Sequence, residues 1–321
     1  MTYVIINALT PIFVIMILGF WAGKAKMVDN QNVSLLNIFV MDFALPAALF
    51  SATVKTPWSG IVHQGSLIVI LTLSMWIAYA AMYFIATKGF KKSPQDSAVL
   101  TLTVALPNYA ALGLPILGSV FGGSSATSLA VAVSIACGSV LMTPFCLLIL
   151  EREKSRAAGT AQGSTLSMLP VLMWRSFKKP IVLGPLLGVV LSAIGLHMPH
   201  IVLHAIKPLG IAATGAALFL TGVILSARKL TINKAVIVSF LIKNLIQPFI
   251  AWGLIVIFGI QPQVAVTAIL MIALSAGFFG VVFGNRFGVQ SPDAEATLLL
   301  SSALCIVTLP LFLSLTSGMM H

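Results

Sequence analysis

The chain is divided into long apolar segments, each close to the length that an α-helix needs to cross a bilayer. Roughly 20 consecutive apolar residues are needed for one crossing. Reading apolar runs between polar breaks gives ten segments, at approximately 3–22, 32–53, 62–87, 97–121, 125–150, 180–196, 200–226, 234–259, 263–285 and 294–318. Only 8% of the residues are charged, against about 25% in soluble domains. We therefore predict an all-α membrane protein with ten transmembrane helices.

Basic residues gather in alternate loops between these segments. With the N-terminus outside, the inward loops hold fifteen of the eighteen lysines and arginines: Lys24, Lys26, Lys88, Lys91, Lys92, Arg152, Lys154, Arg156, Arg175, Lys178, Lys179, Arg228, Lys229, Lys234 and Arg286. Such an excess marks the cytoplasmic side. Both termini are then predicted to be periplasmic, with the spans in a bacterial inner membrane. The net charge of +11 reports this topology rather than nucleic-acid binding.

The one long inward loop, residues 151–179, separates two halves of five segments each, 1–150 and 180–321. Its first part is charged and rich in small residues, which is typical of a flexible linker. Its second part, from Leu166 to Lys179, mixes apolar and basic residues and is predicted to lie in the membrane interface. The first segment lacks a basic n-region and a cleavage site, so we expect a retained span and not a signal peptide.

The two halves share short matches in the same order. Ala47-Ala-Leu-Phe50 reappears as Ala216-Ala-Leu-Phe219, and Ala105-Leu106 reappears as Ala273-Leu274 at nearly the same spacing. The fifth and tenth segments each end with a Thr and Pro pair. An odd number of spans per copy inverts the second copy relative to the first. Inverted repeats are an architecture of secondary transporters, so we predict two inverted five-helix repeats.

The fourth and ninth segments contain residues that interrupt helices at corresponding places. Pro107, Gly113 and Pro115 weaken the fourth, while Gly277 and Gly280 give the ninth a flexible backbone. Paired interruptions in inverted halves point to a substrate site. Half-helices that begin after Asn108 and after Ser275 would direct free N–H groups at an anion, a carboxylate in particular. The alternative interpretation is that Pro and Gly only kink packed helices.

Few ionisable residues lie deep within the segments. Lys243 is four residues from Gln247 on one helix face, and an unpaired cation at this depth costs roughly 2.5–3.5 kcal/mol. Lys243 could be a countercharge for the substrate, a coupling group, a snorkelling lysine, or the structural ion-pair partner of Asp42. Asp42 is the one deep carboxylate and could itself carry a coupling proton. Lys207 is interpreted as an interfacial anchor, and the histidines at 197, 200 and 204 as bystanders rather than metal ligands.

Signatures of enzymes, cofactors and metal sites are absent from the sequence. It contains no Gly-x-Ser-x-Gly elbow, no His-Glu-x-x-His motif and no phosphate-binding loop. The three cysteines lie in apolar segments without Cys-x-x-Cys spacing. We expect neither an enzyme nor ATP-driven transport.

Three stretches, Leu102–Phe121, Gly138–Glu153 and Ile269–Glu295, give the chain a resemblance to a known family. With Leu106-Pro-Asn-Tyr-Ala-Ala-Leu-Gly-Leu-Pro115, Ala276-Gly-Phe-Phe-Gly280 and the central inward loop, the sequence resembles the auxin efflux carriers, and among them most closely the bacterial malonate transporters. The resemblance implies the ten-helix fold of sodium/bile-acid symporters, with crossed fourth and ninth helices. It also implies a scaffold of the first, second, sixth and seventh helices, an elevator-type cycle of the other six, and a homodimer.

By this resemblance, Asn108 takes the place of the family's crossover asparagine and contacts substrate, while Ser275 stands where a second asparagine would be. We therefore expect a proton-coupled carrier of malonate. Malate or another short dicarboxylate, sodium coupling, an ion channel and a membrane-embedded sensor are the alternatives. The candidate substrate-binding residues are Pro107, Asn108, Tyr109, Lys243, Gln247, Ser275 and Gly277.

Overall fold

The computed structural model describes residues 2–55, 64–122, 125–157, 170–171, 174, 177–196, 198–227, 231–316 and 318. Across these ranges the named elements are α-helices and short π-helices, and the one β feature is an isolated bridge. Residues 158–169 lie outside the described residues, so the end of the predicted flexible linker and the start of the predicted interfacial segment at Leu166 are not described; nor is His197.

Every predicted apolar segment contains helix, so the prediction of an all-α membrane protein is confirmed. Six helical stretches are long and apolar enough to cross a membrane: Ser34–Ser51, Gly65–Gly89, Ala126–Ala157, His200–Ser226, Lys234–Phe258 and Pro292–Thr316. Shorter apolar helices fall in the other four segments: Phe13–Lys24, Tyr109–Phe121, Pro180–Ala193 and Pro262–Ile272.

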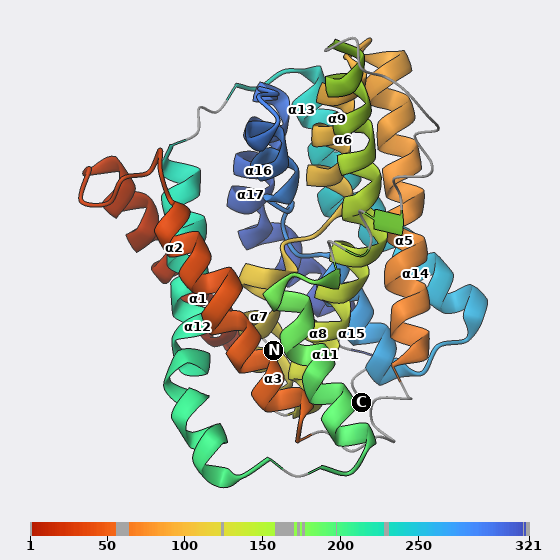
Figure 1. Cartoon of the computed structure of the whole chain (residues 1–321). Helices are drawn as coiled ribbons and strands as arrows, with labels where there is room; N and C mark the ends of the chain where they lie inside the picture. Colours follow the sequence, from red (N-terminus) through yellow and green to blue (C-terminus); the bar gives the residue numbers. More distant parts are fainter. Residues whose placement is uncertain are drawn as a thin grey trace. The chain divides into compact units, whose positions relative to one another are not determined.

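The chain forms two compact units, and each takes segments from both halves of the sequence. Unit 1 comprises Met1–Ile68, Tyr109–Ile135 and Lys178–Arg228. Its elements are α1 (Thr2–Lys24), α2 (Ser34–Ile38), η1 (Phe39–Ala44), α3 (Leu45–Thr53), η3 (Tyr109–Gly113), α7 (Leu114–Phe121), most of α8 (Ser125–Ala136), α11 (Pro180–Ala193) and α12 (His200–Ser226) (Figure 1).

Unit 2 comprises Val69–Asn108, Ala136–Phe177 and Lys229–His321. Its elements are most of α5 (Gly65–Phe84), η2 (Ile85–Gly89), α6 (Pro94–Ala105), η4 (Cys137–Met142), α9 (Thr143–Ala157), α13 (Lys234–Leu241), η6 (Ile242–Ile246), α14 (Gln247–Phe258), α15 (Pro262–Ile272), α16 (Phe279–Arg286) and α17 (Pro292–Thr316).

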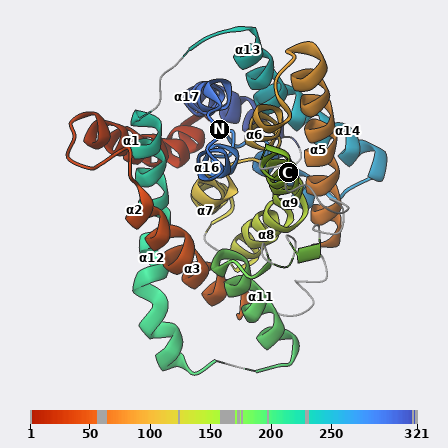
Figure 2. The ribbon, with the colours of Figure 1, turned by 45° about the horizontal axis from the view of Figure 1, so that its top comes forward.

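Glycines let the helices of unit 1 approach backbone to backbone, and Figures 1 and 2 both show α1 lying along α12. A Cβ atom on Gly19 would lie 2.2 Å from the carbonyl oxygen of Phe219. Between α3 and α11, a Cβ atom on Gly188 would lie 2.9 Å from the carbonyl oxygen of Phe50. Small residues allow such close packing in membranes, where lipid supplies no hydrophobic drive for helix association.

These two contacts are related by the same shift along the sequence that takes Ala47-Ala-Leu-Phe50 to Ala216-Ala-Leu-Phe219. The shift takes Gly19 to Gly188 and Phe50 to Phe219, so the two partners exchange roles. A second pair of contacts is related by the same shift along the sequence. A Cβ atom on Gly222 would lie 2.0 Å from the carbonyl oxygen of Met16. At the corresponding positions in the other copy, the Thr53 hydroxyl donates to the carbonyl oxygen of Pro185 at 3.1 Å.

Four of the π-helical segments each end two residues before a proline: η1 before Pro46, η3 before Pro115, η4 before Pro144 and η6 before Pro248. A proline inside a helix lacks an N–H and clashes with the carbonyl four residues earlier. A π-turn widens the backbone and removes that clash. The fourth segment is accordingly continuous through Gly113 and Pro115, so the prediction that these two residues break the helix is wrong.

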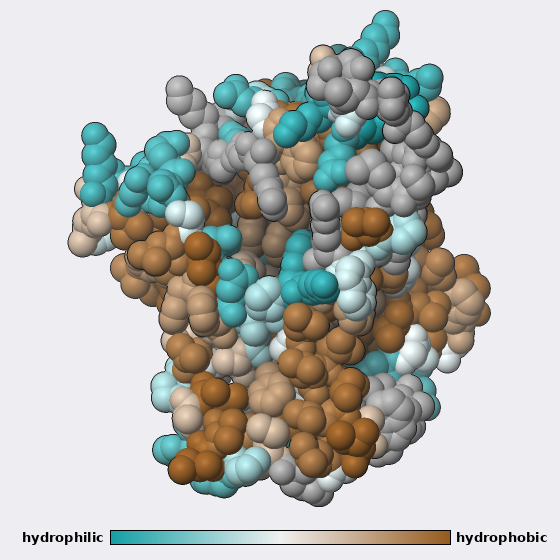
Figure 3. Space-filling model, viewed as in Figure 1, coloured by the Kyte–Doolittle hydropathy of each residue, from teal (hydrophilic) through white to brown (hydrophobic). Residues whose placement is uncertain are grey.

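Apolar side chains cover much of the surface that Figure 3 shows, as lipid contact requires. Ile201 is 78% exposed and Ile211 is 69% exposed, both on α12. On α14 of unit 2, Ile257 is 77% exposed.

Candidate functional site

The two interrupted helices meet within unit 2. Helix α6 ends at Ala105, and Leu106 then takes an extended conformation with φ −96° and ψ 109°. Pro107 pairs with Ala276 in the isolated antiparallel bridge, and the Asn108 N–H donates to the carbonyl of Ser275 at 2.9 Å. Because α15 ends at Ile272 and α16 begins at Phe279, both segments are non-helical where they pair.

Three backbone N–H groups at the interruptions are bonded within the protein. Besides that of Asn108, the Gly277 N–H donates to the carbonyl of Thr103 at 3.1 Å. The Ala276 N–H donates to the Ser301 hydroxyl oxygen at 2.8 Å. The prediction of free N–H groups directed at an anion is therefore wrong for these three donors.

The glycines of the ninth segment permit a close approach to α6, and neither Gly277 nor Gly280 has a positive φ. A Cβ atom on Gly277 would lie 2.3 Å from the Leu106 carbonyl oxygen, and one on Gly280 would lie 2.4 Å from the Val99 carbonyl oxygen. Gly280 also lies inside α16, so the prediction that it breaks the helix is wrong.

The side chains of Asn108 and Ser275 lie beside the bridge without hydrogen-bond partners. Asn108 is 2% exposed and Ser275 is fully buried. Both amide atoms of Asn108 and the hydroxyl of Ser275 are unpaired among the described residues. Leaving a buried polar group unpaired costs about 1–3 kcal/mol, and such groups mark places where a ligand or an ion supplies the missing bonds. Two donors and two acceptors are thus available to a bound molecule.

Lys243 is fully buried and binds the C-terminal end of a half-helix. Its Nζ donates to the Ile272 carbonyl of α15 at 2.7 Å and to Gln247 Oε1 at 2.8 Å. Gln247 Nε2 in turn donates to the Ala105 carbonyl at the end of α6, also at 2.7 Å. The carbonyl ends of helices carry partial negative charge and favour a cation. Lys243 and Gln247 lie on one helix face, as predicted; Lys243 binds the end of α15 and Gln247 binds the end of α6.

Asn244 joins the interruption to α17. Its Nδ2 donates to Thr308 Oγ1 at 3.0 Å, and its Oδ1 accepts from Ser301 Oγ at 2.6 Å. Ser301 also accepts from Ala276, so this chain of bonds reaches the bridge itself. Sequence reasoning missed Ser301 and noted Thr308 only as part of a repeat match, because a single Ser or Thr in an apolar helix is ordinary.

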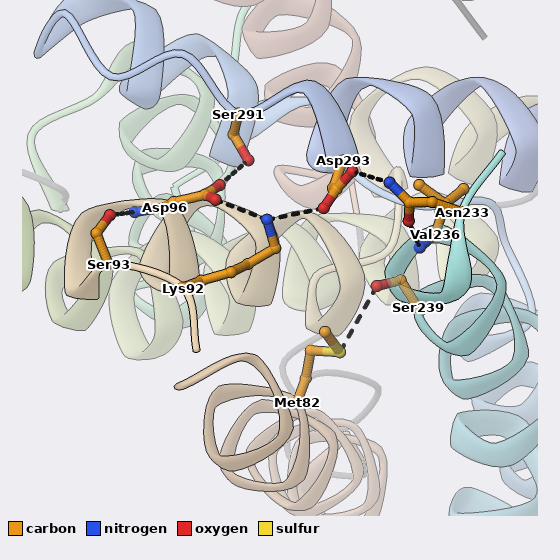
Figure 4. Close-up of polar contacts among 9 residues, drawn as sticks. All are labelled: Met82, Lys92, Ser93, Asp96, Asn233, Val236, Ser239, Ser291 and Asp293. Carbon is orange, nitrogen blue, oxygen red and sulfur yellow. Dashed lines mark hydrogen bonds and ion pairs between the residues drawn. The ribbon is translucent and has the colours of Figure 1, made fainter. Parts of the chain in front are cut away.

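A second polar cluster, shown in Figure 4, joins the N-terminal ends of α6 and α17. Lys92 Nζ lies 2.7 Å from Asp96 Oδ2 and 2.7 Å from Asp293 Oδ2. Asp96 also accepts from the Ser291 hydroxyl. Burial by itself lowers the pKa of Lys92, but its hydrogen bonds to Asp293 and Asp96 outweigh that effect and raise the pKa. The lysine therefore stays protonated between two carboxylates.

The same cluster extends to α13 and was not predicted. Asn233 Nδ2 donates to Asp293 Oδ1 at 2.6 Å, while Asn233 Oδ1 caps α13 by accepting from the Val236 N–H. Ser93 caps α6 by accepting from the Asp96 N–H at 3.2 Å. A Ser followed by Pro and a first-turn Asp is a helix-start signal that sequence reading could have used.

Two other predicted residues belong to unit 1. Asp42 lies in η1 and is exposed, and Tyr109 is the first residue of η3 and is 2% exposed. Since Lys243 belongs to unit 2, its ion pair with Asp42 stays a prediction. The described residues contain no group of three His, Cys, Asp or Glu side chains that could hold a metal ion.

Residues 4–313 match the model of a family described as membrane transport protein. "Uncharacterized transporter YfdV" of Escherichia coli K12 is 26% identical over 308 residues, covering 96% of each chain. "Putative malonate transporter" of Rhizobium meliloti is 24% identical over 303 residues, covering 93% of this chain and 91% of that protein. "Auxin efflux carrier component 8" of Arabidopsis thaliana is 20% identical over 348 residues, covering 92% of each.

Proposed function

This chain belongs to the membrane transport protein family. We propose that it is a secondary active carrier that moves a short organic dianion across a bacterial inner membrane, and that malonate is its substrate. The predicted resemblance to the auxin efflux carriers is confirmed by the family match and by a relative of that name. The family consists of membrane transporters and not of enzymes.

One observation carries the choice of site: the unpaired, buried side chains of Asn108 and Ser275 beside the bridge. Asn108 Nδ2 and Ser275 Oγ can each donate to a carboxylate oxygen. Hydrogen bonds to a charged group contribute about 1.5–3 kcal/mol. Neutral donors in a buried site therefore bind an anion without the strong attraction of a positively charged side chain, which suits a carrier that must also release its substrate.

The choice of malonate rests on the likeness to the Rhizobium meliloti protein and on the two unpaired donors, Asn108 Nδ2 and Ser275 Oγ. A dicarboxylate accepts from these donors in the proposal, with Pro107 and Gly277 as further contacts, while Tyr109, which belongs to unit 1, stays a predicted contact. Lys243 and Gln247 take a supporting role in this proposal, because their polar atoms bind the ends of α15 and α6.

The proposed architecture is ten spans in two inverted repeats, divided at 151–179. It is supported by the two pairs of contacts in unit 1 that share one shift along the sequence. A two-fold relation sends the contact of α1 with α12 to the contact of α11 with α3. Repeats of this kind give outward-open and inward-open states of similar energy.

An elevator-type cycle is supported by the make-up of the units. Unit 1 holds the first, second, sixth and seventh apolar segments, and unit 2 holds most of the third together with the eighth, ninth and tenth. The fourth and fifth segments are divided between the units, the fourth between Asn108 and Tyr109. In this proposal unit 1 is the scaffold, unit 2 carries the substrate, and two copies assemble through their scaffolds.

Orientation and coupling complete the proposal. The bias of basic residues supports an orientation with the Lys92 cluster inside and both termini in the periplasm. Protons are the proposed coupling ion and sodium the alternative; no further cofactor is needed. Collapsing the proton gradient in proteoliposomes should abolish accumulation of labelled malonate. Uptake that survives this collapse and requires sodium would instead assign coupling to sodium.

The decisive experiment compares Asn108, whose buried side chain has no hydrogen-bond partner among the described residues, with Asn244, whose buried side chain is bonded. In Asn108→Ala the unbound protein should melt at or above the wild-type temperature, since no protein bond is lost. Its affinity for malonate should fall about tenfold to a hundredfold. In Asn244→Ala, which removes bonds to Ser301 and Thr308, the melting temperature should fall.

Malonate affinity would be measured by isothermal titration and by the malonate-induced shift in melting temperature, with Ser275→Ala as a second site variant. Ser314→Ala, at an exposed position of α17, controls for substitution in a membrane helix. Wild-type affinity and uptake in both Asn108→Ala and Ser275→Ala would overturn the proposed site.

A further inference from the structure

Unit 1 contains a pocket of about 350 Å³ between α3 and α12, remote in sequence from the interruptions. Its lining residues are Ala48, Ser51, Lys55, His200, Leu203, His204, Lys207, Gly210 and Ile211. On α12 the lining residues at 200, 204, 207 and 211 follow the spacing of one helix face. The backbones are close at the base of the pocket, where a Cβ atom on Gly210 would lie 3.2 Å from the Ala48 Cα atom.

The pocket concentrates basic groups without a balancing carboxylate. Two lysines and two histidines line it, and none of the nine lining residues is Asp or Glu. The imidazole rings of His200 and His204 stack with centroids 5.9 Å apart. Among the described residues, the buried Ser51 hydroxyl has no hydrogen-bond partner. Like charges held together are unfavourable unless an anion neutralises them.

The position of these lysines departs from the charge pattern of the whole chain. Fifteen of the eighteen lysines and arginines belong to the predicted inward loops. The remaining three are Lys243, which is buried in unit 2, and Lys55 and Lys207, which both line this pocket. The two basic residues predicted on the outer side thus converge on one cavity, although scattered lysines would serve equally well as interfacial anchors.

The apolar part of the lining indicates the class of ligand. Leu203 and Ile211 extend the pocket along α12, where Ile211 is 69% exposed and Ile201, next to the lining residue His200, is 78% exposed. The pocket therefore opens beside a surface that suits acyl chains. A free dicarboxylate has no use for such a surface, whereas a phospholipid presents phosphate oxygens and chains together.

We propose that this pocket binds the headgroup of an anionic phospholipid from the outer leaflet. Lys55 and Lys207 bind the phosphate, Ser51 donates to one of its oxygens, and the acyl chains lie along the exposed face of α12. Basic pockets between transmembrane helices recognise headgroups in this way. Lipid binding is measured without transport, so its failure and the failure of the carrier proposal are separate results.

The test uses the purified full chain, delipidated in neutral detergent, with phosphatidylglycerol and phosphatidylcholine as probes. Native mass spectrometry counts bound lipid, and the lipid-induced shift in melting temperature reports affinity. The wild type should retain phosphatidylglycerol about thirtyfold better than phosphatidylcholine, since the two lysines together contribute about 2 kcal/mol near an anionic headgroup. The variant Lys55→Gln/Lys207→Gln should lose this preference, and Lys55→Arg/Lys207→Arg should keep it.

Lys88→Gln/Lys234→Gln is the matched control, because it removes two exposed lysines from predicted inward loops. It should bind phosphatidylglycerol as the wild type does. An equal loss in the control variant would show a general charge effect and overturn the site. Equal retention of both lipids by the wild type would also overturn it. Displacement of phosphatidylglycerol by millimolar inorganic phosphate or malonate would assign the pocket to a free anion instead.

Discussion

In unit 1, the contacts of α1 with α12 recur between α11 and α3 at corresponding positions of the two sequence copies. In unit 2, the polar side chains that hold the interrupted helices come from the second half of the chain. The shift that relates Gly19 to Gly188 places Ser74 and Ala78 opposite Lys243 and Gln247. Glycines pack against carbonyl groups in both units, but unit 2 adds buried side-chain hydrogen bonds from Lys243, Asn244 and Gln247, which only the second copy supplies.

This difference separates two demands on a carrier. Backbone-to-backbone packing is rigid and needs only small residues, so both copies of a repeat can keep it. A site for a particular anion must hold a few hydrogen-bond donors in one asymmetric arrangement. Two identical copies of a repeat would duplicate every donor and could not form such an arrangement. We infer that specificity arose where the polar side chains of the two copies came to differ, as Asn108 of the first copy and Ser275 of the second do.

The largest expected effect comes from removing the cation at the half-helix ends. Lys243→Met leaves the Ile272 carbonyl and Gln247 Oε1 buried without their donor, and unfolding should become about 3 kcal/mol easier. The melting temperature in detergent measures this loss, with Lys243→Arg as the charge-conserving control. A normal melting temperature together with weakened malonate binding would instead make Lys243 a substrate ligand.

A smaller effect tests the symmetry of unit 1. Gly19→Val and Gly188→Val should destabilise the protein to a similar degree, by about 1–3 kcal/mol each, because both force apart helices in backbone contact. Gly215→Val is the control, since a Cβ atom there meets nothing within 4 Å. Thermal unfolding of all three variants provides the measurement. Strongly unequal losses at Gly19 and Gly188 would contradict the two-fold relation.

The smallest effect is expected at the Lys92 cluster, which is partly exposed. Lys92→Gln should cost about 1 kcal/mol or less at low salt. The cost should shrink further at high ionic strength, where charge interactions are screened. Because the folded-state pKa of Lys92 is raised above 10.5, its contribution is complete at neutral pH and is lost only as the pH rises through that higher value. A melting temperature independent of salt in the wild type and variant would count against this account.

Sequence reasoning locates the spans and the main interruption because both depend on local composition. Apolar runs set the helices, and Pro107 removes a donor where α6 stops. Lys243 is identifiable because a cation at that depth is costly. Its partners are not, since the carbonyls of Ile272 and Ala105 carry no sequence signal. Which side chain reaches a helix end is a matter of tertiary packing.

The wrong predictions have physical causes as well. Gly113 and Pro115 predict a break because proline normally ends a helix, but a π-turn before Pro115 accommodates it. The glycines of the ninth segment predict a flexible backbone, whereas Gly277 and Gly280 are required by the proximity of α6. Asp96 and Asp293 give no signal for an ion pair, because a carboxylate in the first turn of a helix is common and usually solvated, and only the fold brings Lys92 between them.

The π-turns before the prolines also affect how variants should be designed. Each π-turn holds one residue more than an α-helix would need, and one residue is about 100° of rotation about the helix axis. Beyond Pro46, Pro144 and Pro248, side chains therefore face about a quarter-turn away from where an ideal helical wheel puts them. Scanning substitutions or cross-linking cysteines chosen from an ideal helical wheel would therefore lie on a helix face other than the intended one in these three spans. Deleting one residue from η1 should realign α2 with α3 on a single wheel.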